Sequence, residues 1–327
     1  MLRRGHAESG AQRRPAAVSG TVTVAMSSPS RSLMPPLLKA MRPKQWIKNL
    51  LLFAGFVFTL NERWQPFSPE MWNYLGRSAA AFLLFSLLSS SIYLINDVID
   101  VDKDRLHPTK KNRPIASGTL SPRTAIVFSV FLMIVALAGG AWLSLPFAGV
   151  AAGYLVMQFG YVFGLKQVAL LEVFVLAIGF VLRAIAGALV IHAQISPWLY
   201  IVTLLGSLFL ALSKRRNELM LLDSGAGHHR KILESYTPAL LDSLTSVVAS
   251  STIMAYSLYT FTSPKLPHNN LMMLTIPLVI FGLFRYLYLA HSHNEGGSPE
   301  DVFLKDKPLI ITIVLWIVTA GIILGLR

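Results

Sequence analysis

Apolar runs of roughly 16 to 24 residues recur along most of this chain, and they constrain its fold more than any other feature. Hydrophobic residues make up 54% of the sequence, charged residues 14%, and the mean hydropathy is +0.55. A soluble domain does not have this composition, so the bilayer is the solvent to assume. The sequence predicts an all-α, polytopic membrane bundle of about nine transmembrane helices. The predicted spans start near Trp46, Arg77, Thr124, Pro146, Val168, Pro197, Ala239, Leu271 and Pro308.

The basic residues are distributed unevenly over the predicted loops. With the N-terminus inside, 23 of the 29 lysines and arginines fall on the inner side and four on the outer side, while Arg183 and Arg285 lie within spans. This asymmetry follows the positive-inside rule. It predicts an integral protein of the inner or plasma membrane whose N-terminus is cytoplasmic. The loops around Asn96, Lys166 and Lys214 then face the cytoplasm.

Composition also excludes several classes of function. The net charge is +13, but the bases are spread over a membrane face without a recognition module, so we predict no nucleic-acid partner. The chain has no cysteine, which excludes disulfides, thiolate catalysis and zinc–sulfur sites. The motifs of P-loop ATPases, zinc proteases and serine esterases are absent from the sequence.

The first 35 residues differ from the rest in composition. They are rich in arginine, serine, alanine and glycine, with Glu8 as their single acid, which predicts a disordered basic extension of residues 1–35 before a transmembrane domain of residues 36–327. The composition fits an organellar transit peptide, and it fits equally a start codon placed too early, with Met26 or Met34 as the true beginning.

A row of carboxylates follows the second predicted span. If the helix continues, Asp97, Asp100 and Asp104 share one face with Asn96 on its flank, whereas Asp102 points the opposite way. Three carboxylates repel one another unless a cation lies between them, and oxygen ligands with an amide favour Mg²⁺. We predict that these four one-face residues hold Mg²⁺ on a substrate diphosphate. A solvated charged loop is the plainer alternative.

Basic residues near this row are candidates for binding substrate phosphates. Arg113 can bind phosphate oxygens bidentately, and Lys110 accompanies it. Arg42, Lys44 and Lys48 precede the first span and could hold a lipid phosphate, or serve only topology and lipid attraction.

Two further spans carry polar residues inside apolar sequence. Tyr161 follows Tyr154 and Gln158 on one helical face, and Lys166 lies in the next turn. Glu172 and Arg183 share a face but lie about 16 Å apart along the helix axis, so they cannot pair with each other. A mid-span arginine is costly and faces the bundle interior, which makes it a candidate functional residue or one half of a structural ion pair.

The sixth predicted span ends in a basic cluster at the same membrane surface as the aspartate row. Lys214, Arg215 and Glu218 lie in it, and Lys214 and Glu218 are neighbours at i and i+4. An exposed helix-end pair accounts for them plainly. The functional alternative is a second wall of the site, basic where the first is acidic.

The spacing of Asn96, Asp97, Asp100 and Asp104, followed by Arg113-Pro114 and Gly118, resembles the first signature of the UbiA prenyltransferase superfamily. The resemblance covers nearly all of the chain after residue 35. It implies an intramembrane, Mg²⁺-dependent transferase in a helical bundle, with diphosphate held between two aspartate-rich motifs. The sequence departs at the second motif, because residues 213–219 read SKRRNEL instead of a repeated aspartate pattern.

That departure, together with RPKQWIKN, YVFGLK, LRAIAG and LESYT, is similar to the decaprenyl-phosphate phosphoribosyltransferase branch of the superfamily. The resemblance implies transfer of 5-phosphoribosyl from phosphoribosyl diphosphate to a polyprenyl phosphate, a step toward lipid-linked arabinose donors for cell-wall arabinan. Asp97, Asp100 and Asp104 would hold the metal, the bases above would clamp phosphates, and Glu172 or Glu218 would accept hydrogen bonds from ribose hydroxyls.

Two rival functions stay open at this point. An aromatic prenyltransferase of the same superfamily would also need Mg²⁺, and the missing second aspartate motif argues against it. A transporter or channel would give flux without a covalent product, but the aspartates lie at one surface instead of mid-membrane. The sequence leaves the oligomeric state open, a homo-oligomer included.

Overall fold

The computed structural model describes residues 35–194, 196–223, 231–267, 269–292, 302 and 305–325. Helices account for nearly all of the regular structure in these ranges, and the extended pairing there is limited to one isolated bridge between Leu60 and Trp64. The predicted extension of residues 1–35 lies outside the described residues, apart from Pro35.

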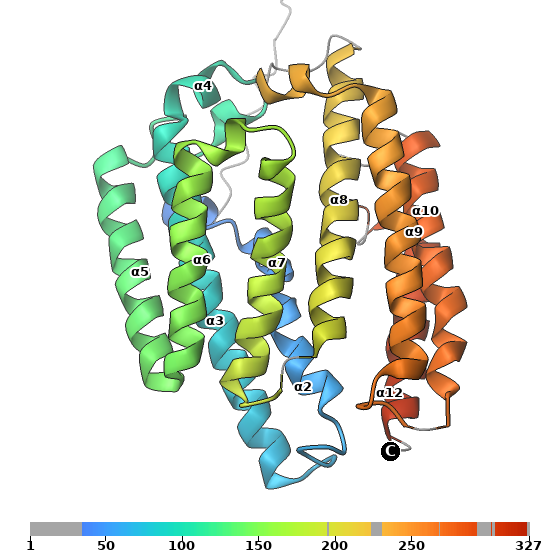
Figure 1. Ribbon diagram of the computed structural model, residues 1–327. Helices are drawn as coiled ribbons and strands as arrows, with labels where there is room; N and C mark the ends of the chain where they lie inside the picture. The colour runs from blue at the N-terminus through green and yellow to red at the C-terminus, as the bar shows by residue number, and fades with distance from the viewer. Residues whose placement is uncertain are drawn as a thin grey trace, which may run out of the picture. The chain divides into compact units, whose positions relative to one another are not determined.

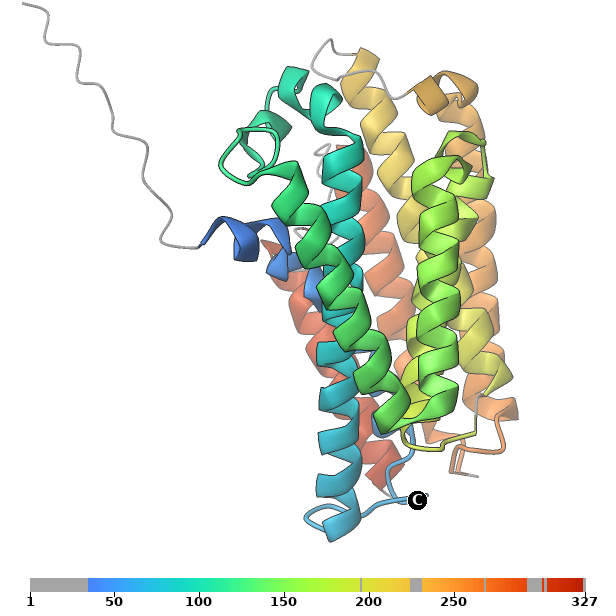
Figure 2. The same ribbon diagram turned by 90° about the vertical axis from the view of Figure 1, so that its left-hand side faces the viewer.

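Eight helices of the described chain are long and apolar enough to cross a membrane. They run side by side in Figures 1 and 2. The eight are α3 (Pro69–Ile99), α5 (Pro122–Leu143), α6 (Leu145–Phe163), α7 (Leu171–Val190), α8 (Pro197–Asp223), α9 (Pro238–Thr262), α10 (Ile276–Ser292) and α12 (Lys307–Gly325). The prediction of an all-α membrane bundle is confirmed, and the chain is an integral membrane protein.

The span predicted near Trp46 differs from the other eight. It forms the 3₁₀ helix η1 (Pro43–Phe53) and the short α2 (Ala54–Phe58) instead of one long α-helix. Because a 3₁₀ helix rises about 2.0 Å per residue, the two segments together still extend about 30 Å, the thickness of the hydrocarbon core. Their backbone lies directly against α7, where a Cβ added to Gly187 would come 2.0 Å from the carbonyl oxygen of Leu52.

Four of the long helices start in the same way. Ser68, Ser121, Ser144 and Thr237 each accept a hydrogen bond from the backbone N–H three residues later, and a proline occupies the first or second helical position. The side chain satisfies an orphan N–H group, and proline costs nothing where no N–H is needed. The sequence therefore encodes these helix starts locally, and the span predicted near Arg77 begins earlier, at Pro69, after the cap at Ser68.

The remaining short elements connect the long helices or precede them. They are α1 (Pro36–Ala40), α4 (Val101–Leu106), η2 (Lys110–Asn112), η3 (Leu165–Gln167), η4 (Lys231–Ser235) and η5 (Leu271–Thr275). Figure 1 shows α4, the turn between α6 and α7, and the segment before α9 at one end of the bundle. The charged residues predicted to form the site are concentrated there.

The core of the bundle lies around α7, the most buried of the eight long apolar helices. Leu52, Phe85, Phe147 and Ile191 are buried together against it. The outward faces of the bundle carry exposed apolar side chains, among them Trp142, which is 90% exposed. A bundle whose outer surface is this apolar is adapted to lipid.

Candidate functional site

The aspartate row begins where α3 ends. Asp100 leaves helical geometry, with φ −92° and ψ 10°, and α4 restarts at the next residue. Backbone hydrogen bonds nevertheless continue through the break, since the Asp100 N–H donates to Asn96 O at 2.9 Å and the Asp104 N–H donates to Asp100 O at 2.8 Å. The helical spacing of Asp97 and Asp104 is therefore preserved across the break.

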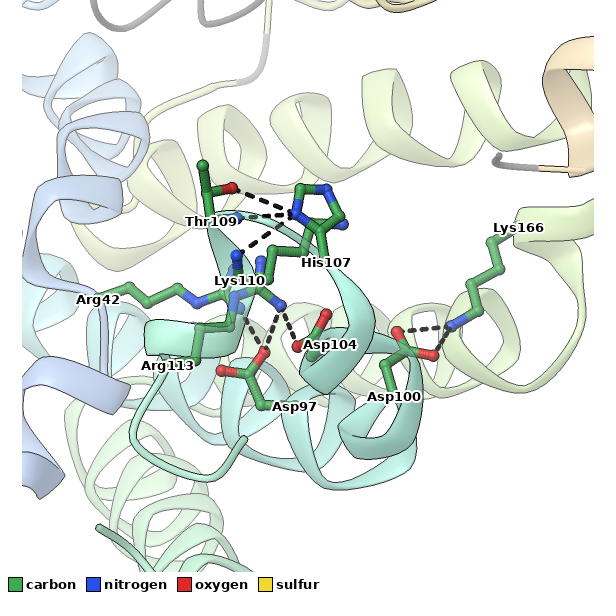
Figure 3. Close-up of polar contacts among 9 residues, drawn as sticks. All are labelled: Arg42, Asp97, Asp100, Asp104, His107, Thr109, Lys110, Arg113 and Lys166. Atoms are coloured by element: carbon green, nitrogen blue, oxygen red, sulfur yellow. Dashed lines mark hydrogen bonds and ion pairs between the residues drawn. The ribbon is translucent and has the colours of Figure 1, made fainter. Parts of the chain in front are cut away.

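Asp97 and Asp104 converge on a single guanidinium group. Arg113 Nη1 donates to Asp97 Oδ1 at 3.0 Å and to Asp104 Oδ2 at 2.6 Å, and Arg42 Nη2 also pairs with Asp97 Oδ1. Both carboxylates are buried, with Asp97 only 2% exposed. Figure 3 shows the two arginines meeting the carboxylates from the same side.

The structure separates Asp100 from these two aspartates, against our expectation of one cluster of three. Its carboxylate pairs with Lys166 Nζ at 3.2 and 3.3 Å, on the opposite side of the row in Figure 3. Lys166 belongs to η3, in the turn between α6 and α7. The turn supplies a cation that the local spacing could not predict, and within the described ranges no three acidic or histidine side chains form a metal-binding group.

The donor chemistry of Asp97 and Asp104 still fits Mg²⁺. Mg²⁺ is usually held by one or two carboxylates together with substrate phosphates, and two carboxylates already converge here on one positive group. The residues that would hold the ion are therefore Asp97 and Asp104. Asp100 lies apart from them in Figure 3, paired with Lys166.

Arg42, which pairs with Asp97, has an unusual backbone conformation. Its φ is +54°, in the left-handed region that residues with a Cβ seldom adopt, and it joins α1 to η1. The Ser90 hydroxyl fixes the adjoining backbone by donating to Met41 O at 3.0 Å, and it accepts from Trp46 Nε1 at 3.0 Å. The guanidinium also lies 5.1 Å from the centre of the Tyr93 ring.

A second charged group joins α7 to α8. Arg215 Nε donates to Glu172 Oε1 at 2.5 Å, and its Nη1 pairs with Glu218 Oε2. Glu172 is fully buried and Arg215 is 2% exposed. The other oxygen of Glu172, Oε2, accepts no hydrogen bond from the residues described. A buried carboxylate oxygen normally has a donor, so this one is an unsatisfied acceptor in the part of the chain described.

The turn between α6 and α7 links the two charged groups. Leu170 has φ +64°, and its N–H donates to the Tyr236 hydroxyl at 2.7 Å. Burial raises the pKa of Tyr236, which keeps the hydroxyl protonated. Tyr161 lies close enough to interact electrostatically with both Tyr236 and Arg215. Tyr236 thus holds the turn that carries Lys166 in front of Asp100.

Arg183 lies deeper in the bundle and contacts neutral groups. Its Nε donates to Asn49 Oδ1 at 2.7 Å, its Nη1 to Gly179 O at 2.7 Å and its Nη2 to the Tyr154 hydroxyl at 2.9 Å. Asn49 in turn donates to Ser86 Oγ on α3 at 2.9 Å. These described contacts tie η1, α3, α6 and α7 together, so its predicted substrate contact stays a prediction.

The other predicted residues occupy the same end of the bundle with varied exposure. Asn96 is half-buried next to Asp97, and the Lys110 N–H donates to His107 Nδ1 at 3.4 Å. Lys214 and Lys48 are half-buried, whereas Lys44 is exposed. Their side-chain roles stay predictions.

Sequence reasoning missed several residues beside Asp97. Lys39, Thr109 and Asn112 line a cavity together with Arg42 and Arg113, which were predicted. The spacing of Lys39 and Arg42, three residues apart, was the one available signal, and the loop residues gave none. The pairing of Tyr236 with Leu170 was equally unpredictable, because the two are 66 residues apart.

Comparison with known proteins identifies the family of this chain independently of the geometry of the site. The model of the UbiA prenyltransferase family matches residues 50–304. A decaprenyl-phosphate phosphoribosyltransferase of Mycolicibacterium smegmatis is 36% identical over 306 residues, which cover 90% of this chain and 94% of that protein. Its counterpart from Corynebacterium glutamicum is 34% identical over 298 residues, covering 88% and 86%.

The fold has a close counterpart among solved structures. A UbiA homologue from Archaeoglobus fulgidus, solved with DMAPP and Mg²⁺, superimposes with a TM-score of 0.67 at 18% identity, covering 89% of this chain and 100% of the homologue. At that identity the likeness concerns the fold. The family match over most of the chain and the extended identity with relatives agree with it, and the chain therefore belongs to the UbiA prenyltransferase family.

Proposed function

We propose that this protein is a Mg²⁺-dependent decaprenyl-phosphate phosphoribosyltransferase. It transfers 5-phosphoribosyl from phosphoribosyl diphosphate to a polyprenyl phosphate and releases diphosphate. The identity of 34% to 36% over nearly the full length of relatives with this name supports the assignment.

One structural observation carries the proposal: the carboxylates of the site are matched by protein cations. Asp97 and Asp104 share Arg113, Asp100 holds Lys166, and Glu172 holds Arg215. A phosphoribosyl donor and a phosphate acceptor bring more negative charge than a prenyl diphosphate and a neutral acceptor. Arginines and lysines held in place by the protein can bind this negative charge, since charge-assisted hydrogen bonds to phosphate are strong.

The first requirement of the reaction is a good leaving group. Mg²⁺, when bound, would neutralise the charge that develops on the departing diphosphate. Asp97 and Asp104 would hold the ion, and Arg42 and Arg113 could then exchange a carboxylate partner for a phosphate oxygen of either substrate. Lys166, next to Asp100, stabilises the diphosphate from the other side of the aspartate row.

The second requirement is attack on carbon 1 of the ribose. The bond from carbon 1 to the diphosphate oxygen breaks with its electron pair going to diphosphate, and an oxygen of the polyprenyl phosphate forms the new bond. That oxygen is already anionic, so no strong general base is needed. Positioning and preorganised charge therefore provide most of the acceleration.

Glu172 offers a place for the sugar. Its Oε2 is buried without a described donor, while Oε1 is held by Arg215. A ribose hydroxyl that donates to Oε2 would satisfy it and orient the ring. Glu218, which is 27% exposed on the same arginine, can accept from a second hydroxyl. This arrangement favours a hydroxyl-rich donor over a purely apolar one.

The proposal includes an orientation in the membrane. The charged end of the bundle faces the cytoplasm, where a soluble phosphoribosyl donor is available, and the polyprenyl acceptor enters from the bilayer. The excess of basic residues in the loops at this end supports that orientation.

The deciding experiment uses purified protein in detergent with Mg²⁺, phosphoribosyl diphosphate labelled in the ribose, and decaprenyl phosphate. Label that moves into the organic phase only when Mg²⁺ is present supports the proposal. The opposite outcome is an absence of transfer while a prenyl diphosphate and an aromatic acid react under the same conditions. That result would assign the chain to the aromatic prenyltransferases of its family.

A further inference from the structure

A cavity of about 230 Å³ lies beside Asp97, on the side of the aspartate row away from Lys166. Three chain segments enclose it: α1 with the residue that joins it to η1, the end of α3, and the loop around η2. The cavity is lined by Lys39, Ala40, Arg42, Asp97, Thr109, Asn112, Arg113 and Pro114.

The cavity has an exposed rim and a buried floor. Lys39, Thr109 and Asn112 are exposed at the rim, whereas Ala40 and Pro114 are buried. An anion could therefore enter from the rim and reach the interior beside Asp97 without displacing packed side chains. The floor is rigid, since Ala40 belongs to the apolar cluster that includes Leu94 and Ile115.

Positive charge predominates around the cavity. Lys39, Arg42 and Arg113 provide three cations, and Asp97 is the one acidic residue of the lining. Lys39 Nζ donates to the neutral carbonyl of Asn112 at 3.4 Å, and within the described part of the chain no carboxylate is ion-paired with it. A phosphate dianion would bring the charge of the lining close to balance, and the amide of Asn112 and the hydroxyl of Thr109 can donate to its oxygens.

The first helix places this cavity next to apolar surface. In Figure 2, α1 lies crosswise to the long helices, on their outer side. Leu37 packs inward against the core cluster, while Leu38, adjacent to Lys39, is 38% exposed. On η1, Leu50 is 52% exposed. A lysine among exposed leucines on such a segment is typical of the boundary between lipid and water.

From these observations we propose that the cavity binds the phosphate of the lipid acceptor, with Lys39 as its specificity-determining cation. The inference rests on the proposed function. A polyprenyl phosphate keeps its tail in the bilayer, so its headgroup must arrive along apolar surface, as α1 and η1 provide. The soluble donor then occupies the side of Lys166 and Glu172, so that the two substrates meet at the aspartate row.

The test compares Lys39→Gln with Lys103→Gln, which changes an exposed lysine of α4 outside the cavity. Initial rates are measured with decaprenyl phosphate and phosphoribosyl diphosphate varied in turn. In Lys39→Gln we expect the KM for decaprenyl phosphate to rise about tenfold, the loss typical of one charge-assisted hydrogen bond. The KM for the donor stays within about twofold, and Lys103→Gln matches the wild type. Melting temperatures equal to that of the wild type establish that both variants are folded.

Two kinetic outcomes would overturn the inference. A rise in the donor KM alone would assign the cavity to phosphoribosyl diphosphate, and unchanged constants would show that it binds neither substrate. Inorganic phosphate added as a competitor distinguishes a lipid headgroup site from a general phosphate site. If the site requires the lipid, low concentrations of inorganic phosphate should inhibit the wild type and Lys39→Gln equally. Stronger inhibition of the wild type would indicate a general phosphate site.

A binding measurement separates this inference from the proposed function. Decaprenyl phosphate is titrated into nanodiscs that contain the protein, in the absence of donor. If the wild type binds it and Lys39→Gln binds about tenfold more weakly, the cavity assignment stands even where no phosphoribosyl transfer occurs. Equal binding by both proteins contradicts the assignment, whatever the transfer assay gives.

Discussion

At the scale of single residues, Asp97 and Asp102 provide a matched pair for the metal site. The Asp97 side chain is 2% exposed and pairs with two arginines, whereas that of Asp102 is 88% exposed and pairs with Arg105 at 3.2 Å. Loss of a direct Mg²⁺ ligand costs more than the 10- to 100-fold typical of residues that only support ligands. We therefore expect Asp97→Ala to lower kcat by more than about 100-fold.

Asp102→Ala is the control, and we expect its rate to stay within about twofold of the wild type, since exposed ion pairs contribute little. Mg²⁺ titrations of both variants provide a second comparison. Similar activity and a similar Mg²⁺ requirement in Asp97→Ala and Asp102→Ala would remove Asp97 from the metal site.

Substitutions of Arg215 and Glu172 test the contribution of their buried ion pair to stability. Arg215→Gln leaves the fully buried Glu172 carboxylate without its arginine partner, which costs about 3–5 kcal/mol of stability. The double variant Glu172→Gln/Arg215→Gln restores a neutral pair and recovers most of that loss. Melting temperatures in detergent measure both effects. A double variant as unstable as the single one would mean that the pair does not act as a unit.

At the scale of secondary-structure elements, Tyr236 connects the segment before α9 to the turn between α6 and α7. Tyr236→Phe removes the acceptor for the Leu170 N–H, at a backbone position whose φ is +64°. The expected cost is about 1 kcal/mol, and the turn that carries Lys166 becomes more mobile. Hydrogen exchange over residues 164–172 measures this directly. Tyr200→Phe, at a side chain that is 45% exposed, should leave exchange unchanged.

The contact between η1 and α7 offers a second test at this scale. A Cβ at Gly187 would lie 2.0 Å from Leu52 O, so Gly187→Ala must push η1 away from α7 and disturb Arg42 at its start. We expect a lower melting temperature and reduced transfer. Gly206, in the middle of α8, has no atom within 4 Å of an added Cβ. Gly206→Ala should therefore fall within about 1 kcal/mol of the wild type or stabilise it.

At the scale of the whole molecule, the proposed orientation can be tested because the chain has no cysteine. Lys111→Cys labels the end that contains the aspartate row, and Glu70→Cys labels the other end of α3, a helix about 46 Å long. In intact cells an impermeant maleimide should react with the Glu70→Cys variant, and with Lys111→Cys only after the membrane is opened. The reverse pattern would place the site on the outer face.

The sequence alone determined where most helices lie and how they start. Apolar runs and capping residues such as Ser121 and Ser144 act within a few residues of themselves, so periodicity and composition reveal them. The sequence also identified the acidic and basic residues concentrated at one end, because residue type and spacing are local. It failed at η1, where backbone contact with Gly187 accompanies a 3₁₀ helix in place of the expected α-helix.

Only the tertiary structure decided which charges meet. Asp100 pairs with Lys166, which lies in the turn between α6 and α7, instead of joining Asp97 and Asp104. Arg215 pairs with Glu172, which is 43 residues away in the sequence. Lys39 contacts the Asn112 carbonyl, and both line a cavity that no local pattern encodes. Such pairings depend on the packing and rotation of whole helices, set by many weak contacts between distant segments, and helical spacing specifies a face without specifying the neighbour that covers it.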